Sequence, residues 1–158
     1  MKCKRILLRM FGAELGRSVI IKQRINIKYP WNISVGDHSW IGEGVWLDSV
    51  GKIKIGAHCC LSQGVRLITG NHNYRSESFD LMICTIELKD GVWLAANSLV
   101  CGNVICKRHS VLTAGAVTTK DLEANKIYAG NPAHAVKDRF KDGKLVELSN
   151  ELQVNEAV

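Results

Sequence analysis

Of the five histidines in the sequence, His72 has the surroundings best suited to chemistry. It lies in the segment Thr69-Gly70-Asn71-His72-Asn73-Tyr74, which is rich in small and hydrogen-bonding residues. An imidazole, whose reference pKa is near 6.5, can take a proton from a hydroxyl at neutral pH and later return one to a leaving group. A loop histidine can also do no more than cap a turn. Residue type and position alone leave both interpretations open.

The positions of three other histidines and of the cysteines indicate structural roles rather than a metal site. His38, His58 and His109 recur at one position of a repeat and are expected to line one edge of the fold. Gly91 interrupts that column and no H-x-x-x-x-H pair is present, so no metal is predicted. Neither C-x-x-C pairs nor zinc-site spacing occur, and we expect buried thiols in a reducing compartment. The cysteines are Cys3, Cys59, Cys60, Cys84, Cys101 and Cys106.

Length and composition indicate one globular domain. The chain has 158 residues, of which 46% are hydrophobic and 23% charged, and no apolar run approaches the ~20 residues of a membrane-spanning helix. The start resembles a secretory signal, but Arg9 breaks the apolar stretch and no cleavage site follows, so we expect a cytoplasmic protein. The net charge of +6 favours anionic partners: phosphorylated cofactors, nucleic acid or membrane surfaces. No basic run singles out nucleic acid.

Aliphatic residues recur every six positions and define the elements that must position His72 and the other histidines. Each group of three such positions predicts one triangular coil of three short strands, with the aliphatics of successive coils stacked into inward columns. Neither a helix nor an alternating hairpin has this period. The repeat predicts an all-β fold of about five coils over residues 15–123. The five groups begin at Leu15, Val35, Ile55, Leu88 and Cys106.

The repeat is broken once, between Leu67 and Leu88, and it is flanked by non-repetitive ends. We predict an excursion loop at residues 72–87, because a long loop in a strict repeat usually carries function. Residues 1–14 form an N-terminal segment, in which residues 2–11 predict a short basic amphipathic helix. Residues 124–158 are expected to supply a C-terminal cap and a tail that is a weak helix or a frayed end.

Several motifs resemble those of the hexapeptide-repeat acyltransferases, most closely the colanic acid biosynthesis acetyltransferases and the galactoside, maltose and nodulation O-acetyltransferases. The resemblance covers roughly residues 11–140. It implies a left-handed parallel β-helix, a homotrimer with active sites between neighbouring prisms, acetyl-CoA as donor, and His72 as the catalytic base. The motifs are YPWN at 29–32, IGEGVW at 41–46, TGNHNY at 69–74, VWLAA at 92–96, AGAVTTKD at 114–121 and GNPA at 130–133.

The resemblance also assigns residues to the donor. Ala96 and Ala114 would allow close backbone approach along the pantetheine channel, and Thr119 and Lys120 would lie near the nucleotide end. His134 and Lys137 occupy positions where the family usually carries basic side chains, although Arg or Lys is usual where His134 stands. For Lys120 and Lys137 the alternative is a solvated surface charge.

The acceptor and the subunit interface are predicted from polar and outward apolar positions. Asp48, Asn71 and Tyr74 are candidate contacts to sugar hydroxyls, within or near a loop that also holds Asn73, Arg75, Glu77 and Asp80. Outward apolar residues are expected to form subunit contacts. They are Trp40, Trp46, Trp93, Leu99, Ile105, Val111 and Val117.

These observations predict an O-acetyltransferase that moves acetyl from acetyl-CoA to a saccharide hydroxyl, in surface or exopolysaccharide biosynthesis. One alternative is acetylation of an antibiotic or amino-acid hydroxyl on the same scaffold. Another is a non-catalytic or metal-binding β-helix protein, such as a metal-dependent hydratase.

Overall fold

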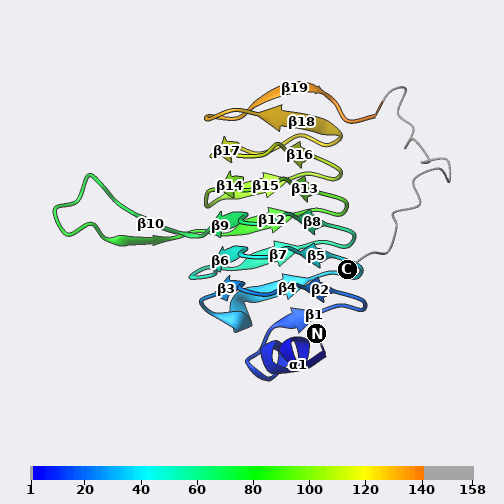
Figure 1. The fold of residues 1–158 in the computed structure, drawn as a ribbon. Helices are drawn as coiled ribbons and strands as arrows, with labels where there is room; N and C mark the ends of the chain where they lie inside the picture. The colour runs from blue at the N-terminus through cyan, green and yellow to red at the C-terminus, as the bar shows by residue number, and fades with distance from the viewer. Residues whose placement is uncertain (1, 141–158) are drawn as a thin grey trace.

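The computed structural model describes residues 2–140 and shows a triangular prism of stacked short strands (Figure 1). One helix, α1 (Lys2–Met10), lies at the base of the prism. A 3-10 turn, η1 (Pro30–Asn32), connects the first coil to the second. The predicted N-terminal helix is therefore confirmed. The tail predicted at residues 141–158 lies outside the described residues.

Apart from one two-stranded sheet, the strands form three sheets, one for each side of the prism. Sheet A contains β1 (Glu14–Leu15), β4 (Ile33–Val35), β7 (Ile53–Ile55), β12 (Ile86–Leu88) and β15 (Val104–Cys106). Sheet B contains β2 (Ile20–Ile21), β5 (Trp40–Ile41), β8 (Cys60–Leu61), β13 (Trp93–Leu94), β16 (Val111–Leu112), β18 (Lys126–Ala129) and β19 (His134–Asp138). Sheet C contains β3 (Asn26–Ile27), β6 (Trp46–Asp48), β9 (Arg66–Ile68), β14 (Leu99–Val100) and β17 (Val117–Thr118).

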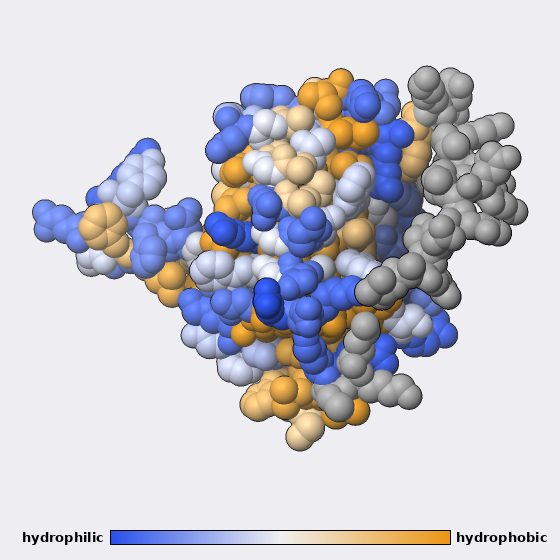
Figure 2. Space-filling model, in the orientation of Figure 1, coloured by the Kyte–Doolittle hydropathy of each residue, from blue (hydrophilic) through white to orange (hydrophobic). Residues whose placement is uncertain are grey.

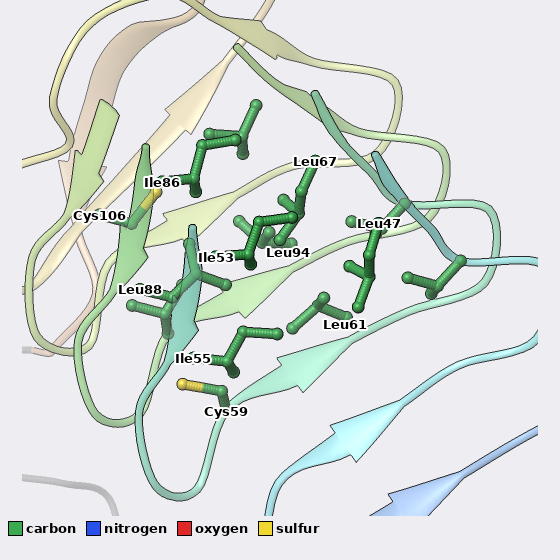
Figure 3. Close-up of a cluster of buried hydrophobic side chains, with 14 of the residues drawn as sticks. Leu47, Ile53, Ile55, Cys59, Leu61, Leu67, Ile86, Leu88, Leu94 and Cys106 are labelled. Carbon is green, nitrogen blue, oxygen red and sulfur yellow. The ribbon is translucent and has the colours of Figure 1, made fainter. Parts of the chain in front are cut away.

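The six-residue columns are confirmed by the strand register. In sheet A, Val35 pairs with Ile55, Ile55 with Leu88, and Leu88 with Cys106, all in parallel strands. The side chains of these columns point into the prism, where they form one continuous core (Figure 3). Each fully buried aliphatic side chain stabilises the fold by roughly 1.5–3 kcal/mol relative to exposure. The repeat therefore sets both the register and the core.

The corner histidines occupy a special backbone conformation. His38, His58 and His109 have φ values of 58°, 54° and 57°, in the left-handed region that a triangular corner requires. The rings of His38 and His58 stack with centroids 5.1 Å apart. Gly91 stands at the same corner, and a β-carbon there would collide with the His109 ring. The predicted histidine edge and its interruption at Gly91 are both present.

The number of coils differs from the five that were predicted, because the prism has about six turns. The sixth is made by a bridge between Cys106 and Leu122 in sheet A and by β18, which pairs with β16 in sheet B. The spacing from Cys106 to Leu122 no longer follows the period of the earlier coils, so the sequence pattern hides this turn. β19 then pairs antiparallel with β18 and ends the described chain as a cap.

Two further features concern the surface of the prism. The predicted exposure of Val111 is wrong: the residue is 3% exposed, because it lies between Trp93 and Ile127 on the adjacent strands of sheet B. Four of the predicted outward residues are exposed, namely Trp40, Trp46, Trp93 and Ile105, and two are half-buried, namely Leu99 and Val117.

Within residues 2–140, no helix is long and apolar enough to cross a membrane.

Candidate active site

The excursion from the repeat is a β-hairpin that projects from the prism between sheets C and A (Figure 1). Its strands are β10 (Gly70–His72) and β11 (Leu81–Ile83), which pair antiparallel with His72 opposite Leu81. The hairpin begins two residues before the predicted start of the loop, and β12 rejoins the prism at Ile86. His72 is exposed at the outer end of β10, so its imidazole is available to a substrate.

The His72 ring is held by a hydrogen bond across the hairpin tip. Its Nδ1 lies 2.6 Å from the carbonyl oxygen of Phe79. A carbonyl oxygen only accepts, so Nδ1 carries the proton and donates it to Phe79. Nε2 of the neutral ring is then unprotonated and can accept a proton. The backbone amide of His72 is bonded in turn to Asn71 Oδ1 at 2.8 Å.

The tip of the hairpin is built around the carboxylate of Asp80. Ser78 donates to Asp80 Oδ1 at 2.7 Å, and Ser76 donates to Oδ2 at 2.9 Å. These hydrogen bonds, that of Ser78 foremost, lower the pKa of Asp80 below its ordinary value. Phe79 stands between these residues in a left-handed conformation with φ of 49°, and its amide donates to the Ser76 carbonyl. The network thereby fixes the carbonyl that orients His72.

The three candidate acceptor residues do not lie together. Asp48 ends β6 on the same edge of the prism as the hairpin, and a β-carbon at Gly70 would stand 3.4 Å from its Oδ2. The Asp48 carboxylate is half-buried and lies 3.4 Å from Lys28 Nζ. Asn71 is in the hairpin beside His72, whereas Tyr74 is 78% exposed near the tip. Asp48 and Asn71 therefore flank the base of the hairpin, and Tyr74 lies away from them.

The two alanines predicted to line the donor channel lie in one shallow groove. Ala96 and Ala114 occupy successive corners between sheets B and C, joined by a hydrogen bond from Gly115 N to the Ala96 carbonyl at 2.9 Å. Gly115 has a φ of 69° and open space where a β-carbon would stand, so the backbone at this corner is accessible. The groove is lined by Ser62, Gln63, Trp93, Ala95, Ala96, Val111, Thr113 and Ala114.

The four remaining donor candidates are not among the residues that line this groove, and they do not meet at one point. The Ala133 amide donates to the Val117 carbonyl at 2.8 Å, so the residue before His134 lies beside β17 of sheet C. Lys137 lies further along β19, opposite Ile127. Thr119 and Lys120 are exposed at the far end of sheet C, where Thr118 Oγ1 donates to the Lys120 carbonyl.

A single chain does not bring the groove and the base together. The hairpin leaves the corner between sheets C and A, whereas Ala96 and Ala114 lie at the corner between sheets B and C. The width of sheet C therefore separates His72 from the groove within one prism. A site that uses both requires the hairpin of one chain to reach the groove of another.

The cysteines and possible metal ligands in the described part of the chain occupy positions that indicate structural rather than catalytic roles. Burial raises the pKa of the Cys59 thiol to about 11 and also raises the pKa of Cys106, so neither is a ready nucleophile. Five cysteines among the described residues are free. No group of three or more His, Cys, Asp and Glu residues in this part of the chain is arranged to hold a metal ion.

Sequence reasoning missed the groups that position His72. The Phe79 carbonyl is a backbone atom and gives no residue-type signal. Asp80 was grouped with polar side chains suited to sugar hydroxyls, but both of its oxygens are engaged by Ser76 and Ser78. The pattern of serines two and four residues before an aspartate is the one signal that could have indicated a hydrogen-bonded turn.

Comparisons with known proteins place these features in a family. No family model matches the chain. WcaF of Escherichia coli, named as a colanic acid biosynthesis acetyltransferase, is 37% identical over 135 residues, which cover 85% of this chain and 74% of that protein.

Two solved structures share the fold. A maltose O-acetyltransferase from Clostridium difficile has a TM-score of 0.83 at 24% identity, over 89% of this chain and 76% of that one. A hexapeptide-repeat acetyltransferase from Vibrio cholerae, solved with acetyl coenzyme A, has a TM-score of 0.82 at 23% identity, over 89% and 79% of the two chains.

Proposed function

The chain belongs to the hexapeptide-repeat acetyltransferases, the family of the colanic acid biosynthesis acetyltransferase WcaF, and on that premise we propose that it transfers acetyl from acetyl-CoA to a saccharide hydroxyl. The observation that carries the proposal is the orientation of His72. Its Nδ1–H donates to the Phe79 carbonyl, which leaves Nε2 as an exposed base on a projecting hairpin. A saccharide hydroxyl is a poor nucleophile at neutral pH and needs such a base.

The chemistry assigned to His72 has two proton movements. Nε2 accepts the proton of the acceptor hydroxyl while the hydroxyl oxygen forms a bond to the acetyl carbonyl carbon. When the carbon–sulfur bond breaks, the imidazolium returns the proton to the departing thiolate, so protons balance over the cycle. The Nδ1–Phe79 hydrogen bond stabilises the positive charge formed in between. General base catalysis of this kind contributes roughly 100- to 10,000-fold to the rate.

The groove supports acetyl-CoA as donor. Small side chains at Ala96 and Ala114 and the open backbone at Gly115 suit a narrow pantetheine arm, which could hydrogen-bond to backbone groups. His134 at the start of β19 and Lys120 at the far end of sheet C offer donors and positive charge for the nucleotide phosphates. No ion pair within residues 2–140 engages Lys120 or Lys137, so their charges are available. Thr119 is assigned to the same end.

The proposed assembly is a closed trimer with a composite site. His72 and the groove lie on different edges of the prism, so a three-fold arrangement can place the hairpin of one subunit over the groove of its neighbour. The exposed side chains of Trp40, Trp46 and Trp93 supply apolar surface for such contacts. Because the acetyl donor is a cytoplasmic metabolite, the cytoplasm is the proposed location.

The acceptor is proposed to be a saccharide, with Asp48 and Asn71 at the base of the hairpin as contacts to its hydroxyls. A coenzyme A release assay across a panel of sugars, a macrolide and serine tests this assignment directly. Saccharide turnover well above that of the other acceptors is the expected result. Turnover of the macrolide or serine alone would move the protein to the alternative class, and no thiol release with any hydroxyl would contradict the O-acetyltransferase assignment.

A further inference from the structure

Helix α1 at the base of the prism has a clearly defined inner side. Leu8 packs against the core of the prism. Lys4 Nζ donates to the Lys22 carbonyl at 2.8 Å, and Arg5 donates to the Val19 carbonyl at 3.2 Å. These three side chains fix which side of the helix meets the first coil.

The opposite side of α1 is apolar and exposed. Ile6, Leu7 and Met10 are 57%, 54% and 77% exposed, and Phe11 directly after the helix is 55% exposed. At 3.6 residues per turn, Ile6 and Met10 lie opposite Leu8 on the helix, and Leu7 lies beside them. A surface helix of a globular protein normally turns its polar side outward, so the usual arrangement is reversed here.

An exposed aromatic residue extends this apolar surface. Trp31 is 59% exposed and lies directly beside Gly12, the residue that follows the helix and Phe11. Figure 2 shows hydrophobic residues gathered at the end of the prism where Figure 1 places α1. We call the exposed side chains of Ile6, Leu7, Met10, Phe11 and Trp31 the basal apolar face.

The helix that carries most of the basal apolar face is basic. The helix sequence KCKRILLRM contains four basic residues and no acidic one. Lys4, Arg5 and Arg9 bond to neutral backbone carbonyls, and none of them takes part in an ion pair within residues 2–140. A basic helix with an apolar side is the pattern of segments that lie in the interface of an anionic membrane.

We propose that the basal apolar face docks the protein onto an anionic phospholipid bilayer, with α1 lying in the plane of the membrane interface. A second copy of the chain fits this face less well, because it would bring a second basic helix, whose Lys4, Arg5 and Arg9 form no ion pair within residues 2–140, against the first. Trp31 suits the headgroup level, where aromatic rings of membrane proteins concentrate. This surface is separate from the hairpin, which projects sideways from the middle of the prism (Figure 1).

In the proposed trimer, all three subunits would dock onto the membrane together. Subunits related by a three-fold axis along the prism would turn all three α1 helices toward the same side. One nine-residue helix binds a membrane weakly, but three on one side act together through multivalency. The docking proposal itself does not depend on the acetyltransferase reaction.

Sedimentation with lipid vesicles tests the proposal with the full chain. We expect binding to phosphatidylcholine vesicles that contain about 30% phosphatidylglycerol, little binding to phosphatidylcholine alone, and weaker binding when salt is raised to about 0.5 M. The variant Leu7→Gln/Met10→Gln keeps good helix formers in α1 and should bind the anionic vesicles at least about tenfold more weakly. The matched control Leu81→Gln/Val136→Gln removes two apolar side chains elsewhere that are 55% and 58% exposed, and it should bind like the native chain.

Each remaining outcome overturns the proposal. A native chain that does not sediment with anionic vesicles has no such membrane surface, and neither does one whose α1 variant binds unchanged. Sedimentation velocity of both variants completes the test. If the α1 variant loses vesicle binding and also changes its oligomeric mass, the face belongs to a contact between copies. If the control loses binding equally, the effect is not specific to the basal apolar face.

Discussion

The imidazole of His72 and the backbone carbonyl of Phe79 face each other across the tip of the projecting hairpin, with Nδ1 and the oxygen 2.6 Å apart. This contact selects the neutral tautomer in which Nε2 is the basic nitrogen. It also ties the reactivity of His72 to the conformation of a tip that contributes no side chain to the core of the prism. Disturbing the tip should therefore change catalysis without unfolding the protein.

The carboxylate of Asp80 provides the first test of that link. Asp80→Asn keeps the size of the side chain but replaces one acceptor oxygen with an amide that cannot accept from a serine. We expect kcat to fall roughly tenfold, because misplacing a catalytic group by about 1 Å can cost as much as 100-fold. KM for acetyl-CoA and the melting temperature should stay near native values. Steady-state kinetics and thermal unfolding measure these quantities.

Glu77→Gln is the matched control for Asp80→Asn, since Glu77 is an exposed carboxylate in the same tip. It should retain native kcat. Equal losses in both variants would show that kcat responds to the charge of the tip and not to the position of the Phe79 carbonyl.

The lowered pKa of Asp80 also predicts how the tip responds to acid. The pKa of Asp80 in the folded chain lies below its ordinary value of 3.8. The ionised carboxylate therefore stabilises the tip above pH 3.8, and that contribution is lost as the pH falls through the lower pKa of the folded state. The amide of Asn73, which bonds to the Asp80 carbonyl, reports on the tip. Its exchange protection, corrected for intrinsic rates, should fall on acidification in the native chain and vary less in Asp80→Asn.

The donor assignment predicts a change in KM rather than in kcat. Lys120→Ala/Lys137→Ala removes two charges assigned to the nucleotide phosphates, which contribute equally to ground-state and transition-state binding. KM for acetyl-CoA should rise more than kcat falls. Lys52→Ala/Lys54→Ala removes the same charge from exposed positions on or beside sheet A and should leave KM unchanged. An unaltered KM in the first variant would place the phosphates elsewhere.

Mixed trimers test the composite site. A chain with His72→Ala lacks the base, and a chain with Ala114→Trp has a blocked groove, so neither homotrimer should turn over. If each site takes the hairpin and the groove from different subunits, random mixing restores about one quarter of the sites, because each of the two requirements is met with a probability of about one half. Activity of the co-refolded mixture measures this fraction. No recovered activity, in mixtures shown to contain mixed trimers, would contradict the shared site.

The repetitive part of the fold could be predicted from the sequence. The non-repetitive parts could be predicted less completely. Inward aliphatics such as Leu61 and Leu94 are the direct physical cause of the columns, so their spacing revealed the prism. The sixth coil was missed because Leu122 follows Cys106 at a different spacing, and Val111 was misassigned because neighbours across sheet B determine its exposure.

The site was predictable only where a side chain carries the signal. His72 was identified through its motif, and the groove at Ala96 and Ala114 through the family resemblance. The Phe79 carbonyl was out of reach, because it depends on a left-handed backbone that the residue type Phe does not indicate. Asp80 resembled a sugar-binding side chain, since a sequence does not reveal that nearby serines already satisfy it.

The turnover number of His72→Asn, measured beside the binding of acetyl-CoA, tests the central claim most directly. Asparagine can still donate a hydrogen bond toward the Phe79 carbonyl but has no basic nitrogen. Because His72 is exposed, the melting temperature should stay near the native value. We expect kcat to fall roughly 100-fold or more, with acetyl-CoA binding retained and the acidic limb of the native pH profile lost; His72→Ala should lose at least as much. A variant that binds acetyl-CoA and keeps more than about a tenth of native turnover would contradict the assignment of His72 as the base.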